Sequence, residues 1–240
     1  MRRIGLNVLW VLLLPAAGSA QGRRRDRRED PSEYERYNTP YDGRFVFLRL
    51  RYDPRVTYSR GDGFFGGGEA GWAHDYPRAE RNLTKLLSEL TLVRPFLEGG
   101  NIYPADSPEI FKYPVAYLSE PGYWSTNDAE VTNLRYYLLK GGFLIVDDFE
   151  GAHWFNFEEK MRQVLPGAQF VRLDTSYPVF HSFFDIESLD HLTWGNYRSE
   201  REPAIYYGVF EDNDPQKRLM VIVNYNNDIG DYWEWSDQGY

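Results

Sequence analysis

The sequence contains no cysteine. This absence excludes a disulfide framework, a zinc site built on thiolates and a thiol nucleophile. It also excludes a membrane anchor attached through a lipid-modified cysteine. The composition fits an exported protein that avoids oxidative thiol chemistry.

Basic charge is scarce in most of the chain. The formal net charge is −9, although the segment Gln21–Tyr37 is rich in arginine, so the excess of acids lies from Asn38 onward. Binding to a phosphate backbone needs a basic face, and we therefore expect no nucleic-acid partner. An acidic body suits solubility, cation binding or a basic protein partner.

Long hydrophobic runs are also missing. The apolar stretch Ile4–Leu14 is too short to span a bilayer. It follows the basic Met1–Arg3 and precedes the small residues Gly18–Ala20, which is the three-part pattern of a secretory signal peptide. We therefore predict an exported, periplasmic or extracellular protein whose mature chain has no transmembrane span. An uncleaved anchor lying in the membrane interface is the alternative. The predicted organisation is a signal peptide at 1–20, an Arg-rich disordered linker at 21–43 and a single domain at 44–240.

Patterns of strands and helices alternate through the first half of that domain. Phe45–Tyr52 reads as a strand, and 77–92 has apolar residues at helical spacing. The continuous apolar run Phe143–Val146 is typical of a parallel strand buried on both faces, with Asp147 and Asp148 ending it. Further strands are predicted at Arg94–Leu97, Val115–Ser119, Phe170–Leu173, Ala204–Phe210 and Leu219–Asn224, and further helices at Ser125–Leu139, capped by Ser125 or Thr126, and at Trp154–Leu165.

These elements predict an α/β fold. We expect a three-layer sandwich with a mostly parallel, flavodoxin- or amidotransferase-like sheet. The last two strands flank a polar turn and should form a hairpin, which gives the sheet an antiparallel C-terminal extension. The chain ends shortly after a segment rich in tryptophan, and we predict no further helix there.

Ligands of open parallel sheets bind beyond the carboxyl ends of the strands. Three strand-to-helix loops are expected to meet at that edge. Two adjacent carboxylates that leave a buried strand are costly unless a helix N-terminus, a cation or a shared proton compensates them. The alternative is that they bond to neighbouring N–H groups in a turn. The loops bring together His74, Asp75, Glu120, Asp147, Asp148, Glu150 and His153, a set of oxygen and nitrogen ligands that suits a hard or borderline divalent metal.

Aromatic residues lie in the same loops. Trp72, Tyr123 and Trp124 are candidates to stack on a ligand, although such rings serve more often in a core. In Asn224–Trp235, acids including Asp228 and Asp231 alternate with aromatics. This pattern faintly resembles a calcium loop or a sugar-binding platform, and its alternative is an ordered loop that packs its tryptophans under the sheet.

Four segments, Trp72–Asn82, Gly141–Gly151, Pro178–Ile186 and Leu219–Glu234, resemble the bacterial family called domain of unknown function 4159. The resemblance runs from about Phe45 to the end and implies no particular chemistry. Members of the family continue into one more helix, so this chain looks shortened. At the level of fold, the family is similar to class I glutamine amidotransferase-like proteins, including the ThuA-like group. Those amidotransferases carry a cysteine where this chain has Asp147 or Asp148, so the resemblance implies no glutamine amidotransferase activity.

Three functions remain open from the sequence. In the first, the domain binds a small polar ligand, such as a carbohydrate, without catalysis. Trp72, Tyr123 and Trp124 would stack on it, and Asp147, Asp148 and His74 would bond to it. In the second, Asp147 or Asp148 acts with His74 or His153 in a metal-assisted hydrolase, which requires His74 and the carboxylate within reach of each other. In the third, the domain is a scaffold in an envelope protein complex and exposes an apolar patch. No cofactor is required by the sequence, although a divalent metal fits it.

Overall fold

The fold is that of a computed structural model, which describes residues 35–53, 71–189 and 203–238. All of these residues belong to one compact unit, residues 31–240. The predicted signal peptide lies outside the described residues and stays a prediction. In the part of the chain that the structure describes, no helix combines the length and apolar character needed to cross a membrane.

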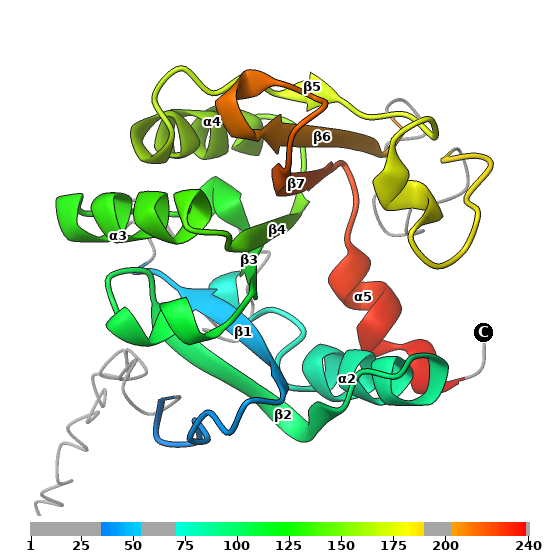
Figure 1. The fold of residues 1–240 in the computed structure, drawn as a ribbon. Coiled ribbons are helices and arrows are strands. Elements are labelled where there is room, and N and C mark those ends of the chain that lie inside the picture. Colours follow the sequence, from blue (N-terminus) through cyan, green and yellow to red (C-terminus); the bar gives the residue numbers. More distant parts are fainter. Residues whose placement is uncertain (1–34, 54–70, 190–202, 239–240) are drawn as a thin grey trace, which may run out of the picture. The chain divides into compact units, whose positions relative to one another are not determined.

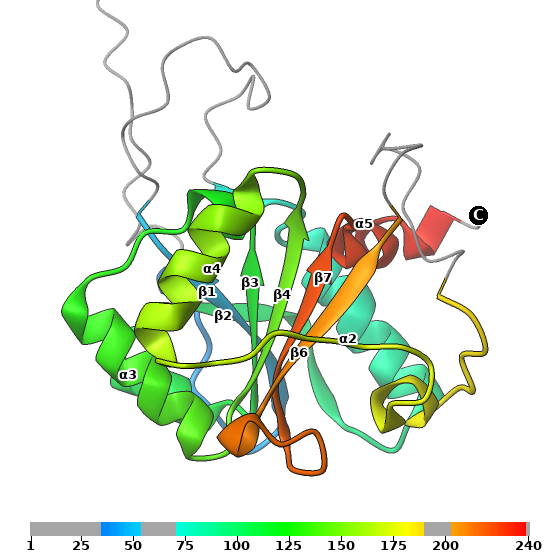
Figure 2. The same cartoon turned by 90° about the horizontal axis from the view of Figure 1, so that it is seen from above.

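The described residues form a seven-stranded sheet with the order β2-β1-β3-β4-β7-β6-β5. Its strands are β1 (Phe45–Arg51), β2 (Pro95–Pro104), β3 (Val115–Ser119), β4 (Phe143–Phe149), β5 (Val171–Arg172), β6 (Ile205–Phe210) and β7 (Leu219–Tyr225). The first four strands and β7 are parallel, whereas β6 runs antiparallel to both β7 and β5 (Figure 2). This topology confirms the predicted parallel sheet with an antiparallel extension.

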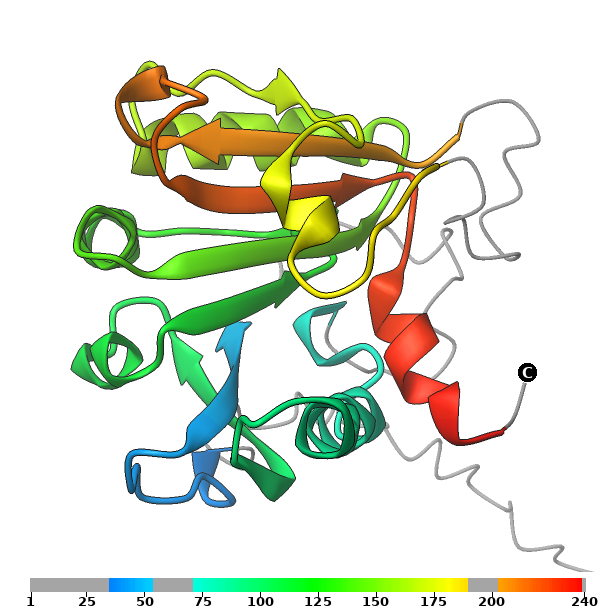
Figure 3. The same ribbon diagram turned by 45° about the vertical axis from the view of Figure 1, so that its right-hand side comes forward.

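Helices cover both faces of the sheet. They are α2 (Arg78–Leu90), α3 (Asp128–Leu139), α4 (His153–Val164) and α5 (Ile229–Glu234). Helices α3 and α4 lie on one face, and α2 and α5 lie on the other, where they pack against each other (Figures 1 and 3). The described residues therefore make the three layers of an α/β sandwich.

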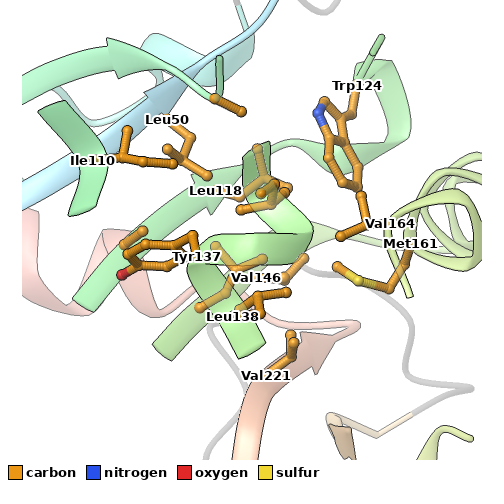
Figure 4. Packing of buried hydrophobic residues seen from close by; sticks show 14 of the residues in the cluster. Leu50, Ile110, Leu118, Trp124, Tyr137, Leu138, Val146, Met161, Val164 and Val221 are labelled. Atoms are coloured by element: carbon orange, nitrogen blue, oxygen red, sulfur yellow. The ribbon is translucent and has the colours of Figure 1, made fainter. Parts of the chain in front are cut away.

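Strand β4 lies at the centre of the sheet, where neighbouring strands and helices cover its apolar side chains. Val146 pairs with Leu118 of β3 and with Val223 of β7, and its side chain is fully buried. Figure 4 shows Val146 packed with Leu138 of α3 and with Met161 of α4. A side chain in such a position has no access to water on either face, which is why the run shows no polar alternation.

The path of the chain changes direction at one point in the sheet. From β1 the chain passes through α2 to β2 on one side, and it then returns to β3 on the other side of β1. Connections that leave neighbouring parallel strands in opposite directions open a crevice beyond their carboxyl ends, where open α/β sheets bind ligands. In this chain the connections change sides between β1 and β3, so the carboxyl ends of these strands are the expected place for a ligand.

Four local details differ from the sequence predictions. Helix α3 is capped by Asn127 rather than Ser125 or Thr126, because Asn127 and Glu130 form a reciprocal capping box that holds both backbone amides. Strand β4 continues to Phe149, which pairs with Tyr225. Strand β2 is ten residues long and therefore longer than predicted. The tryptophan-rich segment contains a short helix, α5, because the side chain of Asp228 caps its first turn by accepting from the backbone N–H of Asp231.

The start of the domain also differs from the prediction. Part of the segment that we assigned to a disordered linker is bonded to β2. Asn38 donates to the carbonyl oxygen of Ile102 and accepts from its N–H, and the N–H of Thr39 donates to Asn101. These bonds extend the ordered unit to at least Asn38.

Candidate functional site

Polar side chains from four strand ends meet at the carboxyl edge of the sheet. His74 and Asp75 follow β1, and Glu120 follows β3. Asp148 lies near the end of β4, and Asp228 follows β7 just before α5. Because these strands are parallel neighbours, their ends bring residues that are far apart in the sequence to the same edge.

His74, Asp75, Asp148 and Asp228 form a compact group, which we call the acidic cluster. One ligand atom from each lies within 4.8 Å of the others. The His74 Nδ1 atom is 2.7 Å from Asp148 Oδ2 and 3.3 Å from Asp75 Oδ1. Ligand atoms on adjacent positions of an octahedral cation site are about 3 Å apart, since each lies about 2.1 Å from the ion. The spacing in the cluster therefore suits a shared cation.

The backbone at this edge adopts unfavourable conformations. Asp75, Glu120 and Asp148 have φ angles of 64°, 50° and 63°, in the left-handed region. This region costs a non-glycine residue of the order of 1 kcal/mol, and such costs gather at functional sites. The surrounding fold therefore holds these three acids in a backbone conformation that is unfavourable for residues of their type.

One oxygen of the cluster has no partner in the described structure. The Asp75 side chain is only 2% exposed, and its Oδ2 atom is buried without a hydrogen bond. Leaving a buried acceptor unpaired costs about 1–3 kcal/mol, and more for a charged group. A proton or a cation at this oxygen removes the cost.

Burial and mutual repulsion change the protonation of the site. Burial raises the pKa of Asp75 to about 8 and that of Glu120 to about 9, and the charge of Asp148 adds to both shifts. Burial also raises the pKa of Asp228 well above its usual range. For His74, burial opposes the charged form, but its hydrogen bond to Asp148 and the nearby carboxylate charges together outweigh burial and raise the pKa to about 10. The site thus retains protons that a bound cation can displace.

These shifts predict that the chelator-treated protein loses stability as the pH rises from 5 to 9. The raised pKa values of Asp75 and Glu120 mean that the folded state holds protons that the unfolded state has already lost, and His74 acts in the same direction. Stability falls with pH wherever the folded state binds more protons. Urea unfolding of the chelated protein at several pH values measures the slope, and Asp75→Asn should flatten it. A stability that is constant or rises over this range contradicts the prediction.

A buried ion pair supports the loop that carries His74. Arg49 of β1 and Glu80 of α2 are both fully buried, and the Arg49 Nε atom donates to Glu80 Oε1 over 2.5 Å. The Nη1 atom of Arg49 also donates to the carbonyl oxygens of Trp72 and His74, over 3.0 and 2.7 Å. The guanidinium therefore ties the turn before Asp75 to β1 and α2.

Asp147, which the sequence suggested as a catalytic residue, is bonded within the fold through one of its oxygens. Its side chain is fully buried, and its Oδ2 atom accepts from the Tyr117 hydroxyl and from the backbone N–H of Gly230, each over 2.9 Å. The carboxylate thus joins β4, β3 and the start of α5. Asp148 is the member of the pair that belongs to the acidic cluster.

The two tryptophans proposed to stack on a ligand are core residues. Trp72 and Trp124 are each 2% exposed and pack in the main hydrophobic cluster, where Figure 4 shows Trp124 near Val164. Indole rings more often contribute buried apolar area to a core than an exposed surface to a ligand. Neither ring therefore offers a face to a ligand, and we remove both from the proposed ligand-binding set.

Tyr123 and His153 lie together beside the cluster. Their rings meet edge to face with centroids 4.8 Å apart. A Cβ atom on Gly122 would overlap the His153 ring, so this close approach requires glycine. Burial lowers the pKa of His153, which favours the neutral imidazole. Glu150, from the same loop, is exposed.

Some residues of the site have no signal in the sequence. The hydroxyl of Ser119 donates to Asp148 over 3.3 Å, and nothing in the strand pattern marks it. Asp231 and Glu234 lie on α5 and form a second group of carboxylates with Asp75. Glu234 was missed because α5 was not predicted, so the two acids could not be placed on one helical face.

The family model described as "Domain of unknown function (DUF4159)" matches residues 47–240. The chain therefore belongs to the DUF4159 family, as the sequence motifs indicated. A search of curated proteins found no match. The similarity to ThuA-like amidotransferases stays a prediction.

Proposed function

We propose that the domain binds a divalent cation in the acidic cluster and uses it to hydrolyse a small polar substrate. The observation that carries this proposal is the convergence of four ligand atoms, from three separate segments, within 4.8 Å of one another. The burial of the Asp75, Asp148 and Asp228 carboxylates supports it, because acidic groups that are buried together need a positive partner.

The donor set indicates the kind of cation. One imidazole nitrogen and three carboxylates suit Mn²⁺ or Zn²⁺ better than the softer ions, which prefer thiolates. A cation at this position would supply a Lewis acid and lower the pKa of a bound water. His74, Asp75, Asp148 and Asp228 would hold it, and the Ser119 hydroxyl orients Asp148 by hydrogen bonding.

Glu120 completes the proposed chemistry as a proton donor. It is 8% exposed and interacts electrostatically with Asp148 and His74. In the cation-free protein, burial raises the pKa of Glu120 to about 9, so its carboxyl group carries a proton at neutral pH. A protonated carboxyl group beside the substrate can transfer this proton to a leaving group.

The hydrolase proposal is favoured over simple ligand binding for a structural reason. Binding of a carbohydrate without catalysis relied on stacking rings, and two of the three candidate rings are buried in the core. The hydrolase proposal required His74 near a carboxylate, and His74 is 2.7 Å from Asp148. Export remains part of the proposal and is supported by the signal-peptide pattern of residues 1–20.

Thermal unfolding of the purified protein tests the cation site. After chelation, Mn²⁺, Zn²⁺, Mg²⁺ or Ca²⁺ is added singly. A cation at about a hundred times its Kd adds roughly 2.7 kcal/mol, which for a domain of this size raises the melting temperature by about 5–10 °C. We expect such a shift with Mn²⁺ or Zn²⁺, and Asp148→Asn should abolish it.

The chain offers a matched control for this substitution. Asp185 also bonds to a histidine, His181, over 3.1 Å, but its side chain is 86% exposed. Asp185→Asn should therefore keep the whole shift. If no cation stabilises the protein, or if the two substitutions behave alike, the acidic cluster is not a cation site.

A further inference from the structure

Helix α5 carries a second group of carboxylates against the acidic cluster. Asp231 and Glu234 are three residues apart, so they lie on one face of the helix. One oxygen from each, together with one from Asp75, lies within 4.8 Å of the others. Asp75 thus belongs to both groups.

The two oxygens of Asp75 face different neighbours. Oδ1 lies 3.3 Å from His74 Nδ1, within the acidic cluster. Oδ2 faces the start of α5, because a Cβ atom built on Gly230 would overlap it. This contact requires glycine at position 230 and brings the backbone beside Asp231 directly against Asp75. A carboxylate with one oxygen facing each group of ligands has the geometry needed to bridge two cations.

The oxygen on the α5 side is the one without a partner. Oδ2 of Asp75 is buried and accepts no hydrogen bond, although the whole side chain is only 2% exposed. A cation in the acidic cluster that binds Oδ1 leaves this oxygen unsatisfied. A second cation on the α5 side would satisfy it.

The fold holds α5 in place for such a role. The side-chain amide of Asn82 on α2 donates to the carbonyl oxygens of Trp233 and Glu234, over 3.0 and 2.8 Å. The indole N–H of Trp235 donates to Asp231 Oδ1 over 3.1 Å, which orients that carboxylate. The helix is therefore fixed at both ends, by Asp228 at its start and by Asn82 at its end.

We propose that Asp75 bridges two divalent cations, the second of which is held by Asp231 and Glu234. This inference rests on the proposed function, since the first cation occupies the acidic cluster. The second site offers only carboxylate oxygens and therefore selects a hard cation such as Mg²⁺ or Mn²⁺. Paired cations in enzymes lie about 3.5–4 Å apart and stabilise both the attacking and the leaving oxygen.

The number of cations per chain separates this inference from the proposed function. Mn²⁺ is used as the probe because it accepts both ligand sets, and its binding to the full chain is measured by titration calorimetry and by metal analysis after dialysis. We expect two Mn²⁺ per chain in the wild type and one in the variant Asp231→Asn with Glu234→Gln. Asp237→Asn, an exposed acid just beyond α5, is the control and should keep two.

Each outcome has a distinct meaning. One Mn²⁺ in the wild type, unchanged in the α5 variant, overturns the second site and leaves the proposed function standing. No bound Mn²⁺ overturns both. An electron paramagnetic resonance spectrum of the wild type with two Mn²⁺ should show exchange coupling between the ions, and this readout does not depend on whether a variant folds. Two uncoupled ions contradict the bridge.

Discussion

Glu80→Gln is expected to lower the free energy of unfolding by about 3–5 kcal/mol, because it leaves the buried Arg49 charge without its counter-ion. The two side chains are 1% and 0% exposed, so water cannot replace the lost partner. Burial opposes the charge of Arg49, but Glu80, Tyr117 and Asp75 together outweigh this effect and raise the pKa of the guanidinium, so Arg49 stays charged. The substitution preserves shape, so packing is not the cause of the loss. Chemical denaturation measures it.

The same helix provides the control for this prediction. Lys85 and Glu89 of α2 are 4.0 Å apart and more than half exposed. Exposed pairs contribute at most about 1 kcal/mol, so Glu89→Gln should change stability by less than that. If the two substitutions have equal effects, the buried pair does not depend on its charge.

A double substitution separates stability from positioning. Replacing Arg49 by Met and Glu80 by Leu removes both charges, and apolar replacement of a buried ion pair is often neutral or stabilising. The protein should then regain much of its stability. It should still bind the cation more weakly than the wild type, because the carbonyl oxygens of Trp72 and His74 lose the guanidinium that holds them. A double variant that binds the cation as well as the wild type would contradict a positioning role for Arg49.

Arg49 also shows where reasoning from the sequence fails. The sequence identified Phe45–Tyr52 as a strand but gave no reason to expect a buried charge at Arg49, because leucine and arginine simply alternate there. In the structure, all five central residues of β1 are buried, because α2 and its loop cover the face on which Arg49 lies. Local alternation cannot reveal a partner that is 31 residues away. Buried ionic contacts of this kind depend on tertiary structure and leave no local signature.

The fold could be predicted from the sequence more fully than the details of the site, because it depends on simple patterns of apolar residues. The unbroken apolar run of β4 predicts a central strand, and the rule for parallel sheets then names the edge at which His74, Asp75 and Asp148 lie. The roles of adjacent residues could not be separated in this way. Asp147 and Asp148 look equivalent in the sequence, but the left-handed backbone of Asp148 turns one carboxylate to the cluster and leaves the other bonded within the fold.

Aromatic residues and short helices were the weakest part of the prediction. A tryptophan in a polar loop is equally consistent with a core ring and with a binding platform, and only the packing of α4 and β3 decides for Trp124. Helix α5 is six residues long and depends on the cap at Asp228 and on contacts with α2. Short helices draw their stability from tertiary packing rather than from local preference, so their sequences carry little signal.

Glu120→Gln is expected to reduce the hydrolytic rate constant by about 10²–10⁴-fold, the usual contribution of a positioned general acid. Glutamine keeps the shape of the side chain but has no transferable proton. The position itself should survive, because the backbone at Glu120 is held from outside the site: the Tyr52 hydroxyl donates to the carbonyl oxygens of Ser119 and Glu120, over 3.1 and 2.7 Å.

Turnover is measured on the cation-loaded protein with small chromogenic esters, phosphate esters and amides. The stabilisation by the cation, measured in parallel, should be unchanged, because Glu120 is not among the four proposed ligands. Glu89→Gln, which makes the same chemical change on the exposed face of α2, should retain full activity. Full turnover in Glu120→Gln would show that the proton comes from another group, and loss of the cation's effect would instead identify Glu120 as a ligand.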